Sequence, residues 1–264
     1  MMLQGKVALI TGATRGIGKA TALVLGEAGA DIGLVDILPE VEHTAAAVAA
    51  TGRRTATAVC DIADPAQVHA AVESIRASVG PIDILVNNAG IVNNIAPLAR
   101  MTHEAWEREL AVNLSGAFNV IREVIGGMAA RKWGRIINVS SVAALGGLHN
   151  QAGYAASKAG LIGLTKTVTL EYGRAGITCN AVLPGLIGTE LVSAMPAEIR
   201  NAAVAATPAR RLGSTTEVGQ LIAFLASDAA GFINGAEITI DGGLRLNTSS
   251  LASRRELTSS RSGA

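Results

Sequence analysis

The chain has 264 residues and a formal net charge of +1; 49% of its residues are hydrophobic and 16% are charged. A chain of this length and apolar content can form one large domain with a sizeable core. Its charge offers no basic footprint for nucleic acid and no polybasic membrane patch, and no stretch of about 20 residues is apolar enough to span a bilayer.

Short apolar runs alternate along the chain with alanine-rich segments of helix length. Several runs are apolar almost throughout, which is typical of strands covered on both faces. The predicted strands are 6–10, 31–36, 55–60, 82–87, 135–140, 177–183 and 237–240. The predicted helices are 16–29, 39–52, 65–79, 103–131, 154–174 and 215–227. This alternation predicts an α/β fold, a single-domain Rossmann-like doubly wound parallel sheet flanked by helices.

Local signals mark where some helices begin and where the domain ends. Asp64 before Pro65, and the segment 215–217, combine a capping residue with a proline or an acid in the first turn, which is typical of helix starts. No linker divides the chain before residue 246. We therefore expect one domain over 1–246 and a polar, mobile C-terminal tail over 247–264.

The cysteines and histidines give no sign of a disulfide or a metal site. Cys60 and Cys179 lie far apart in apolar runs, and neither they nor the histidines show the spacing of metal ligands. Two reduced thiols in the core and an N-terminus without a signal-peptide pattern indicate a cytoplasmic protein. No metal is expected.

The first predicted strand leads into a turn that contains Gly12, Gly16 and Gly18. Glycines permit a tight turn and a close approach of backbone to pyrophosphate, and the following helix offers free N–H groups at its N-terminus. A P-loop for nucleoside triphosphates is excluded, because Ala13 and Ala20 stand where it needs a glycine and a hydroxyl residue. The glycines also depart from the usual dinucleotide spacing, since they occupy the first, fifth and seventh positions. Their place between strand and helix nevertheless predicts a dinucleotide site.

The second predicted strand ends in Asp36. A carboxylate at this point can accept hydrogen bonds from the adenosine ribose hydroxyls and would repel a 2′-phosphate. Ile37 and Leu38 follow without a basic residue, and only Arg15 could hold that phosphate. These residues favour NAD over NADP.

Tyr154 and Lys158 lie four residues apart on a predicted helix and therefore share one face of it. Free tyrosine has a pKa of about 10, so a useful base near neutral pH needs a drop of ~3 units, or ~4 kcal/mol. A nearby ammonium group favours the phenolate, and an oxidised nicotinamide would add positive charge. The pair, with Ser141 after the fifth predicted strand, indicates acid/base chemistry.

Together these motifs resemble those of a classical short-chain dehydrogenase/reductase, over residues 5 to about 244. The matching motifs are Thr11-Gly12-x-x-x-Gly16-x-Gly18, Asn87-Asn88-Ala89-Gly90, Asn113, Ser141, Tyr154-x-x-x-Lys158 and Pro184-Gly185. The resemblance implies a seven-stranded sheet in the order 3-2-1-4-5-6-7 and usually a homotetramer. It also implies an NAD(P)-dependent oxidoreductase that interconverts a secondary alcohol and a ketone.

The resemblance implies roles for four catalytic residues. Tyr154 would exchange a proton with the substrate oxygen, and Ser141 would hydrogen-bond that oxygen. Lys158 would hold the nicotinamide ribose and lower the pKa of Tyr154. Asn113 would position a water molecule for a proton relay. Hydride transfer itself belongs to the cofactor.

The resemblance also implies the residues that bind cofactor and substrate. The expected cofactor-binding residues are Gly12, Arg15, Gly16, Ile17, Gly18, Asp36, Asp61, Ile62, Asn88, Ala89, Gly90, Tyr154, Lys158, Pro184, Gly185, Ile187 and Thr189. The expected substrate-pocket residues are Asn94, Ala143, Gln151, Leu186 and Leu191. The apolar segment from 186 to about 211 has the length of a lid, which favours a hydrophobic or cyclic substrate.

Two alternatives stay open. The sequence is also similar to 3-oxoacyl-(acyl carrier protein) reductases, which typically use NADPH and dock an acidic carrier on basic residues near the active-site entrance. Arg131, Lys132 and Arg174 are the candidates for such docking. The other alternative is a non-catalytic dinucleotide-binding protein, although such a protein would typically have lost one of the catalytic side chains, and these are all present.

Overall fold

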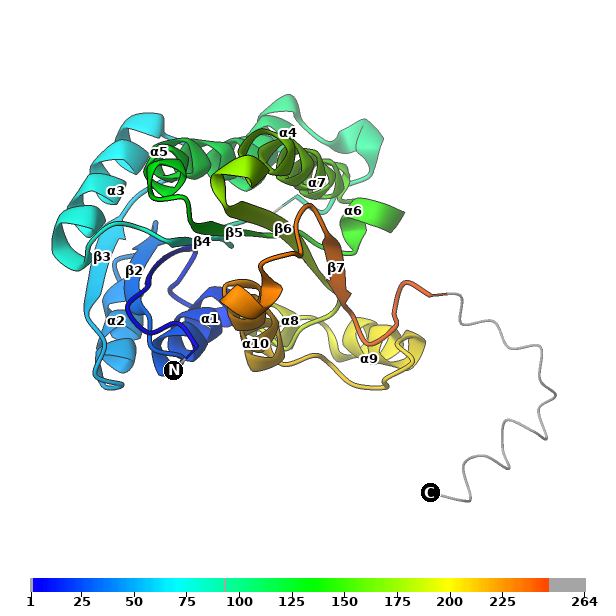
Figure 1. Ribbon diagram of the computed structural model, residues 1–264. Helices are drawn as coiled ribbons and strands as arrows, with labels where there is room; N and C mark the ends of the chain where they lie inside the picture. The colour runs from blue at the N-terminus through cyan, green and yellow to red at the C-terminus, as the bar shows by residue number, and fades with distance from the viewer. Residues whose placement is uncertain (1, 93, 247–264) are drawn as a thin grey trace, which may run out of the picture.

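A parallel sheet of seven strands forms the centre of the computed structural model, which describes residues 2–92 and 94–246 (Figure 1). The strand order is β3-β2-β1-β4-β5-β6-β7. The strands are β1 (Val7–Thr11), β2 (Asp31–Asp36), β3 (Thr55–Val59), β4 (Ile84–Asn87), β5 (Gly134–Val139), β6 (Ile177–Pro184) and β7 (Glu237–Ile240). This order confirms the doubly wound sheet predicted from the sequence.

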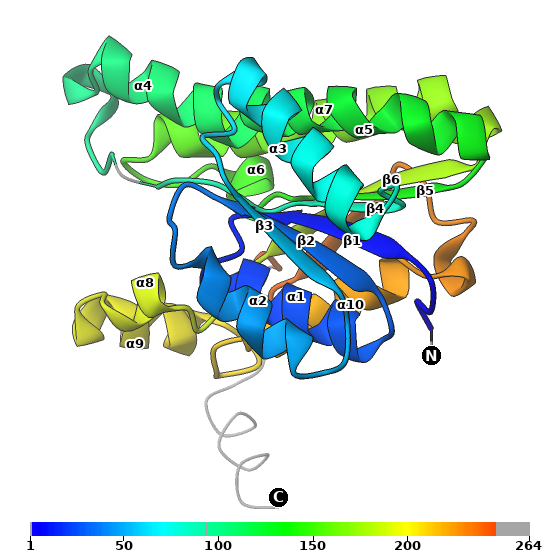
Figure 2. The ribbon, with the colours of Figure 1, turned by 90° about the vertical axis from the view of Figure 1, so that its left-hand side faces the viewer.

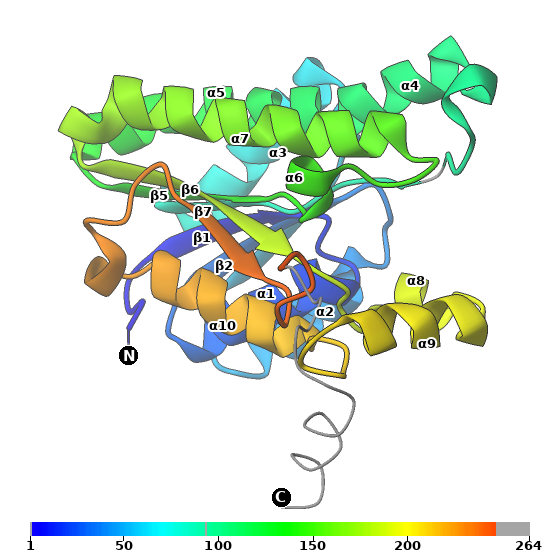
Figure 3. The same ribbon diagram turned by 90° about the vertical axis from the view of Figure 1, so that its right-hand side faces the viewer.

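Helices cover both faces of the sheet (Figure 2). One face carries α1 (Gly16–Glu27), α2 (Val41–Ala49) and α10 (Thr215–Leu225). The opposite face carries α3 (Pro65–Val79), α4 (His103–Leu110), α5 (Gly116–Arg131) and α7 (Ala152–Tyr172). The shorter helices α6 (Ala143–Gly146), α8 (Glu190–Ser193) and α9 (Ala197–Ala206) follow β5 and β6 (Figure 3).

Helix starts follow from local side-chain contacts. Asp64 accepts hydrogen bonds from two backbone N–H groups of the first turn of α3, and Pro65 is the first residue of that helix, as predicted. At α10 the capping residue is Ser214, one position before the expected segment. Its hydroxyl accepts from the Glu217 N–H at 3.1 Å, and the Glu217 carboxylate accepts from the Ser214 N–H at 2.7 Å. This reciprocal pair is a capping box.

The structure differs from the predicted helices in two places. The long helix expected over 103–131 is interrupted by a π-helical turn at Ala111–Ser115, which divides it into α4 and α5. The segment expected as a lid contains α8 and α9. No residue of α9 is buried, so packing against the core does not fix this helix.

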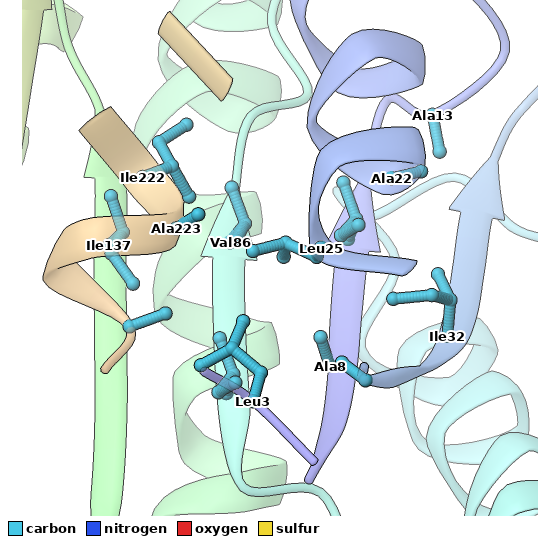
Figure 4. Close-up of a cluster of buried hydrophobic side chains, with 14 of the residues drawn as sticks. Leu3, Ala8, Ala13, Ala22, Leu25, Ile32, Val86, Ile137, Ile222 and Ala223 are labelled. Carbon is cyan, nitrogen blue, oxygen red and sulfur yellow. The ribbon is translucent and has the colours of Figure 1, made fainter. Parts of the chain in front are cut away.

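Each face of the sheet has its own apolar cluster. Along β1, Ala8 and Ile10 join the cluster beneath α1 and α10, whereas Val7 and Leu9 join the cluster beneath α3 and α5. Leu25 of α1 lies near strand residues of the first cluster (Figure 4). Because both faces are covered, the central strands are apolar at nearly every position, and their hydrophobic runs made them easy to predict.

The chain crosses to opposite faces of the sheet after two neighbouring strands. β1 leads into α1 on one face, and β4 leads toward α4 on the other. The connections therefore diverge and leave a crevice beyond the carboxyl ends of these strands, which is where open α/β sheets bind ligands. Figure 2 shows α8 at the same edge of the sheet.

Several other expectations concern the chain as a whole. Cys60 and Cys179 are free and buried, as predicted. Among the helices of the described residues, none has the length and apolarity required for a membrane span. The expected tail at 247–264 lies outside the described residues, and the domain boundary at 246 stays a prediction.

The core packing predicts a large effect of Leu25→Ala. Leu25 is completely buried, so its truncation should lower the free energy of unfolding by about 2–5 kcal/mol through lost burial and the cavity that remains. Val59→Ala, at a position 59% exposed on β3, is the control and should change it by less than about 0.5 kcal/mol. Urea denaturation measures the free energy of unfolding of both variants. If Leu25→Ala changes it as little as Val59→Ala does, the assignment of Leu25 to the core is contradicted.

Candidate active site

The glycine turn after β1 is closed by contacts that no larger residue permits. A Cβ at Gly18 would lie 2.1 Å from the Gly12 carbonyl oxygen, and one at Gly12 would lie 2.7 Å from the Ala89 Cα. Gly12 also has a φ of +66°. The side-chain amide of Asn88 donates to the carbonyl oxygens of Thr11 at 3.0 Å and Gly12 at 2.9 Å. The turn is therefore joined to the loop after β4.

A cleft of about 450 Å³ opens beside this turn. Gly16 and Ile17, the first residues of α1, form part of its wall, so the N-terminal end of the helix lies where a pyrophosphate could bind. Among the residues expected to bind cofactor, the cleft is lined by Gly12, Arg15, Gly16, Ile17, Asp36, Asp61, Ile62, Asn88, Ala89, Gly90 and Thr189. Gly18 is packed behind the turn instead. This shape and these residues fit a dinucleotide.

Asp36 lies in the wall of this cleft at the end of β2. Its carboxylate accepts hydrogen bonds from the backbone N–H groups of Thr14 at 2.9 Å and Leu38 at 3.2 Å. A carboxylate has about four acceptor sites, so the same oxygens can still accept from two ribose hydroxyls. Arg15, the only basic residue that the sequence offered for a 2′-phosphate, lines the same cleft.

Arg108 of α4 also lines the cleft, although it belongs to no motif that was recognised in the sequence. Its guanidinium group pairs with the Asp61 carboxylate at 2.8 Å and so joins α4 to the loop after β3. Half-exposed pairs of this kind stabilise a fold only weakly. The pair restricts how Asp61 can reach a bound adenine.

A second cleft, of about 220 Å³, continues from the first. The two share Asn88, Gly90 and Thr189 as lining residues. The remaining expected site residues meet here: the cleft is lined by Ser141, Tyr154, Lys158, Pro184, Gly185 and Ile187. A hydroxyl, a phenol and an ammonium group thus lie beside the space that continues from the dinucleotide cleft.

Lys158 is buried and joins α7 to β5. Its Nζ donates to the Val139 carbonyl oxygen at 2.8 Å, and the Ser140 hydroxyl donates to the Lys158 carbonyl oxygen at 2.7 Å. Burial lowers the pKa of Lys158 to about 8. Its Nζ lies 5.8 Å from the centre of the Tyr154 ring, so the two residues share a face of α7 as their spacing predicted.

The pKa of Tyr154 differs from the expectation. Burial raises the pKa of Tyr154 above its ordinary value, a hydrogen bond with Ser141 lowers it, and the charge of Glu109 raises it further. Lys158 is not among the groups that lower this pKa, so the drop expected from Lys158 does not occur in the protein alone. Burial penalises the phenolate, and the ammonium group of Lys158 donates a hydrogen bond to the Val139 carbonyl oxygen. An oxidised nicotinamide in the cleft would add the missing positive charge.

Asn113 lies in the π-helical turn, and its amide group is already committed. Its Nδ2 donates to the Ile91 carbonyl oxygen at 2.9 Å and to the Ser157 hydroxyl at 3.1 Å, while its Oδ1 accepts from the Ile91 N–H at 2.7 Å. These contacts hold the loop after β4 near Lys158. They leave the side-chain amide less able to position the water molecule that the resemblance implied.

The residues expected in the substrate pocket are more scattered. Leu191 lines both clefts, whereas Leu186 lines a separate, smaller cavity. The Ala143 N–H donates to the Ser141 hydroxyl at 3.1 Å, and Asn94 donates weakly to the Ala105 carbonyl oxygen at 3.4 Å. Neither they nor Gln151 are among the described residues that line the two clefts.

Sequence reasoning missed four apolar residues of the second cleft and one buried acid. Ile91, Val92, Val139 and Val192 line the cleft without belonging to a recognisable motif. Glu109 is completely buried one helical turn before Asn113. A charged residue on the same face as Asn113 was the available signal for it. Within the described ranges, no three His, Cys, Asp or Glu side chains are placed to hold a metal ion.

Comparisons with known proteins agree with this geometry. The family model described as enoyl-(acyl carrier protein) reductase matches residues 12–245. Nodulation protein G of Azospirillum brasilense is 42% identical over 242 residues, which cover 90% of this chain and 98% of that protein. The 3-oxoacyl-[acyl-carrier-protein] reductase FabG of Thermotoga maritima is 42% identical over 245 residues, which cover 92% and 99%. The crystal structure of levodione reductase matches with a TM-score of 0.88 and 36% identity, covering 91% of this chain and 98% of that one.

The chain belongs to the classical short-chain dehydrogenase/reductase family. It is an oxidoreductase that acts on CH–OH groups, and membership of the family implies an NAD(P) cofactor. The resemblance that the motifs indicated is confirmed.

The basic residues considered for carrier docking lie at the wrong end of this short-chain dehydrogenase/reductase. Lys132 and Arg174 shortly precede β5 and β6, and Arg131 pairs with Asp83 just before β4. They therefore lie near the amino ends of the strands, whereas the clefts open at the carboxyl ends. Within one chain they do not flank the clefts, and docking of a carrier on them stays a prediction.

Burial of Lys158 predicts that Lys158→Met stabilises the protein while removing activity. The pKa of Lys158 is lowered from 10.5 to about 8, so the charged form is penalised in the folded state below pH 8. The penalty disappears as the pH rises toward 10.5. We expect a gain of about 1–3 kcal/mol at pH 7, after loss of the hydrogen bond to Val139. The gain should shrink above pH 8.

Urea unfolding of both proteins between about pH 7 and 10 measures this difference. Lys166→Met, at an exposed position on the same helix, is the control and should change stability by less than about 0.5 kcal/mol. A Lys158→Met protein that is less stable than the wild type at pH 7 would show that the buried ammonium group stabilises the fold.

Proposed function

We propose that the protein is an NAD-dependent oxidoreductase that interconverts a secondary alcohol and a ketone on a hydrophobic or cyclic substrate. The observation that carries this proposal is the meeting of Ser141, Tyr154 and Lys158 in one cleft, which continues into a cleft suited to a dinucleotide. Tyr154 and Lys158 of α7 and Ser141 after β5 would have no reason to converge there for packing alone.

Each of these groups has a part in the proposed reaction. In the direction of reduction, Tyr154 gives its phenolic proton to the carbonyl oxygen, and the Ser141 hydroxyl hydrogen-bonds the same oxygen as negative charge develops on it. Lys158 holds the ribose hydroxyls next to the nicotinamide, and Asn113 holds the adjoining loop. When bound, the nicotinamide supplies or accepts the hydride.

Asp36 supports NAD over NADP. Its carboxylate lies in the cleft wall and can accept from both ribose hydroxyls, but it would repel a 2′-phosphate. Arg15 in the same wall is the group that would favour NADP. The positive charge of Arg15 would attract the 2′-phosphate of NADP, but the Asp36 carboxylate would repel it. Two backbone N–H groups hold that carboxylate in place.

The walls of the second cleft support an apolar substrate. Ile91, Val92, Leu191 and Val192 surround the space near Tyr154. The structural likeness to levodione reductase, whose name gives a dione as its substrate, favours a ketone substrate. Assembly as a homotetramer is inferred from the family.

The alternative is a 3-oxoacyl-(acyl carrier protein) reductase that uses NADPH. Its support is the 42% identity to FabG of Thermotoga maritima over nearly the whole length of both chains. Asp36 opposes the use of NADPH, and within one chain the basic residues considered for docking a carrier lie at the edge of the sheet opposite the clefts. A non-catalytic dinucleotide-binding protein is disfavoured because the phenol, ammonium and hydroxyl groups are all present.

Replacement of Tyr154 by Phe tests the proposed reaction. Loss of the phenolic proton should lower kcat/KM by about 10²–10⁴-fold with secondary alcohols or ketones. The dissociation constant for NADH, measured by fluorescence titration, should change by less than about twofold, because the hydroxyl contributes little to binding. The other tyrosine of α7 provides the control: Tyr172→Phe should keep full activity. Undiminished turnover by Tyr154→Phe would sink the proposal.

Replacement of Asp36 by Ala tests the choice of cofactor. The wild-type protein should prefer NADH to NADPH, and Asp36→Ala should reduce the ratio of their kcat/KM values by about 10–100-fold, because a carboxylate no longer faces the 2′-phosphate. Asp31→Ala, at the other end of β2, should leave the ratio unchanged. A wild-type preference for NADPH would mean that Arg15 outweighs the carboxylate.

A further inference from the structure

An acidic side chain lies next to the glycine turn, where a pyrophosphate could bind. Glu190 is the first residue of α8, and Figure 2 shows this helix at the edge of the sheet from which α1 starts. A Cβ added at Gly16 would lie 3.7 Å from Oε2 of Glu190 and 3.3 Å from Cγ2 of Thr189. The Glu190 carboxylate is therefore next to the first residue of α1, in the wall of the dinucleotide cleft.

The start of α1 favours an anion. Its first turn carries no acidic residue, and the side chain of its capping residue, Arg15, makes no capping hydrogen bond. The first N–H groups of a helix have no partner within the helix, and they carry partial positive charge. A ligand with two phosphate groups that binds to this turn meets the negative charge of Glu190 there.

The charge of Glu190 is uncompensated within the part of the chain that the structure describes. Its side chain is exposed, and no ion pair within residues 2–92 and 94–246 involves it. Behind Gly16, a groove of about 360 Å³ is lined by both Glu190 and Lys19 of α1. Lys19 is exposed as well and does not pair with the carboxylate. The repulsion between Glu190 and a bound phosphate is therefore not cancelled by a neighbouring ion pair.

Helix α8 is held to the rest of the domain by little buried surface. Of its four residues, all of them described, Val192 alone is buried, and none of the described residues of α9 is buried. Segments with few buried apolar contacts open at low cost in free energy. Because α8 can shift, the repulsion lowers the affinity for a dinucleotide but does not prevent its binding.

On the basis of the proposed function, we propose that Glu190 lowers the affinity for the pyrophosphate of the dinucleotide and so promotes release of the cofactor after each turnover. A dehydrogenase must exchange its oxidised and reduced cofactor in every cycle, and product release limits the rate of many enzymes. The N-terminal end of α1 attracts the pyrophosphate, and the carboxylate on α8 opposes this attraction. The balance of the two sets how long the cofactor stays bound.

Replacement of Glu190 by Gln tests this proposal, because it removes the charge and keeps the shape of the side chain. The dissociation constant for NADH, measured by fluorescence titration, should fall by about 3–10-fold, the size expected for a unit charge several ångström away in a partly exposed site. ADP, which carries the pyrophosphate without the nicotinamide, should show a fall of the same size when it competes with NADH. Adenosine, which carries no phosphate, should change by less than about twofold. In about 1 M salt the difference for NADH should largely disappear, because exposed charges are screened.

Two further variants separate the charge from other effects. Glu198→Gln, at an exposed position on α9 outside the lining of both clefts, removes the same charge and should change the dissociation constant by less than about twofold. Glu190→Asp keeps the charge and should bind NADH with nearly the wild-type affinity. A Glu190→Asp protein that binds as tightly as Glu190→Gln would show that the charge is not the cause, and the proposal would be wrong.

The dissociation rate of NADH tests the role in release. Measured by rapid displacement with excess NAD, it should be lower in Glu190→Gln by most of the change in affinity. An unchanged dissociation rate would restrict Glu190 to the first encounter and overturn its role in release. A wild-type protein that binds neither NADH nor ADP removes the proposed function itself. Equal affinities of the wild type and Glu190→Gln remove only the role of Glu190.

Discussion

A buried ammonium group connects the two elements on which the candidate site depends. Lys158 donates from its Nζ to the Val139 carbonyl oxygen, and the hydroxyl of Ser140 donates to the Lys158 carbonyl oxygen. Sliding of α7 along β5 would separate the buried ammonium group from its acceptor and leave the charge without compensation, which would have a large cost. The same contacts set the positions of Tyr154, one helical turn earlier, and of Ser141, next to Ser140. Lys158, which we propose binds the cofactor, therefore also helps to fix the positions of Tyr154 and Ser141.

A second close contact gives the dinucleotide cleft its shape. The amide group of Asn88 bridges two carbonyl oxygens of the glycine turn, while the amide group of Asn113 holds Ile91 further along the same loop. The loop after β4 thus separates a cleft suited to a dinucleotide from the space next to Tyr154. Asn88 and Asn113 thus connect segments that are far apart in the chain, and these segments form one continuous site.

The sequence allowed prediction of whatever depends on local periodicity or on a motif. The seven strands were predictable from their apolar runs, and the pairing of Tyr154 with Lys158 from a spacing of four on a helix. Packing between distant elements was not predictable: the pair of Arg108 with Asp61, the burial of Glu109 and the exposed helix α9 are examples. The rise in the pKa of Tyr154 was also not predictable. Its largest cause is burial, and the burial of a side chain is known only from the folded structure.

The most direct test is a crystal structure of the protein with NAD and a cyclic secondary alcohol. We predict that the alcohol oxygen lies within about 2.6–3.2 Å of both the Tyr154 and Ser141 hydroxyl oxygens, with the nicotinamide facing the carbon that bears it. A nicotinamide bound outside the paired clefts, or an alcohol oxygen that contacts neither hydroxyl, would contradict the assignment of these residues to the reaction.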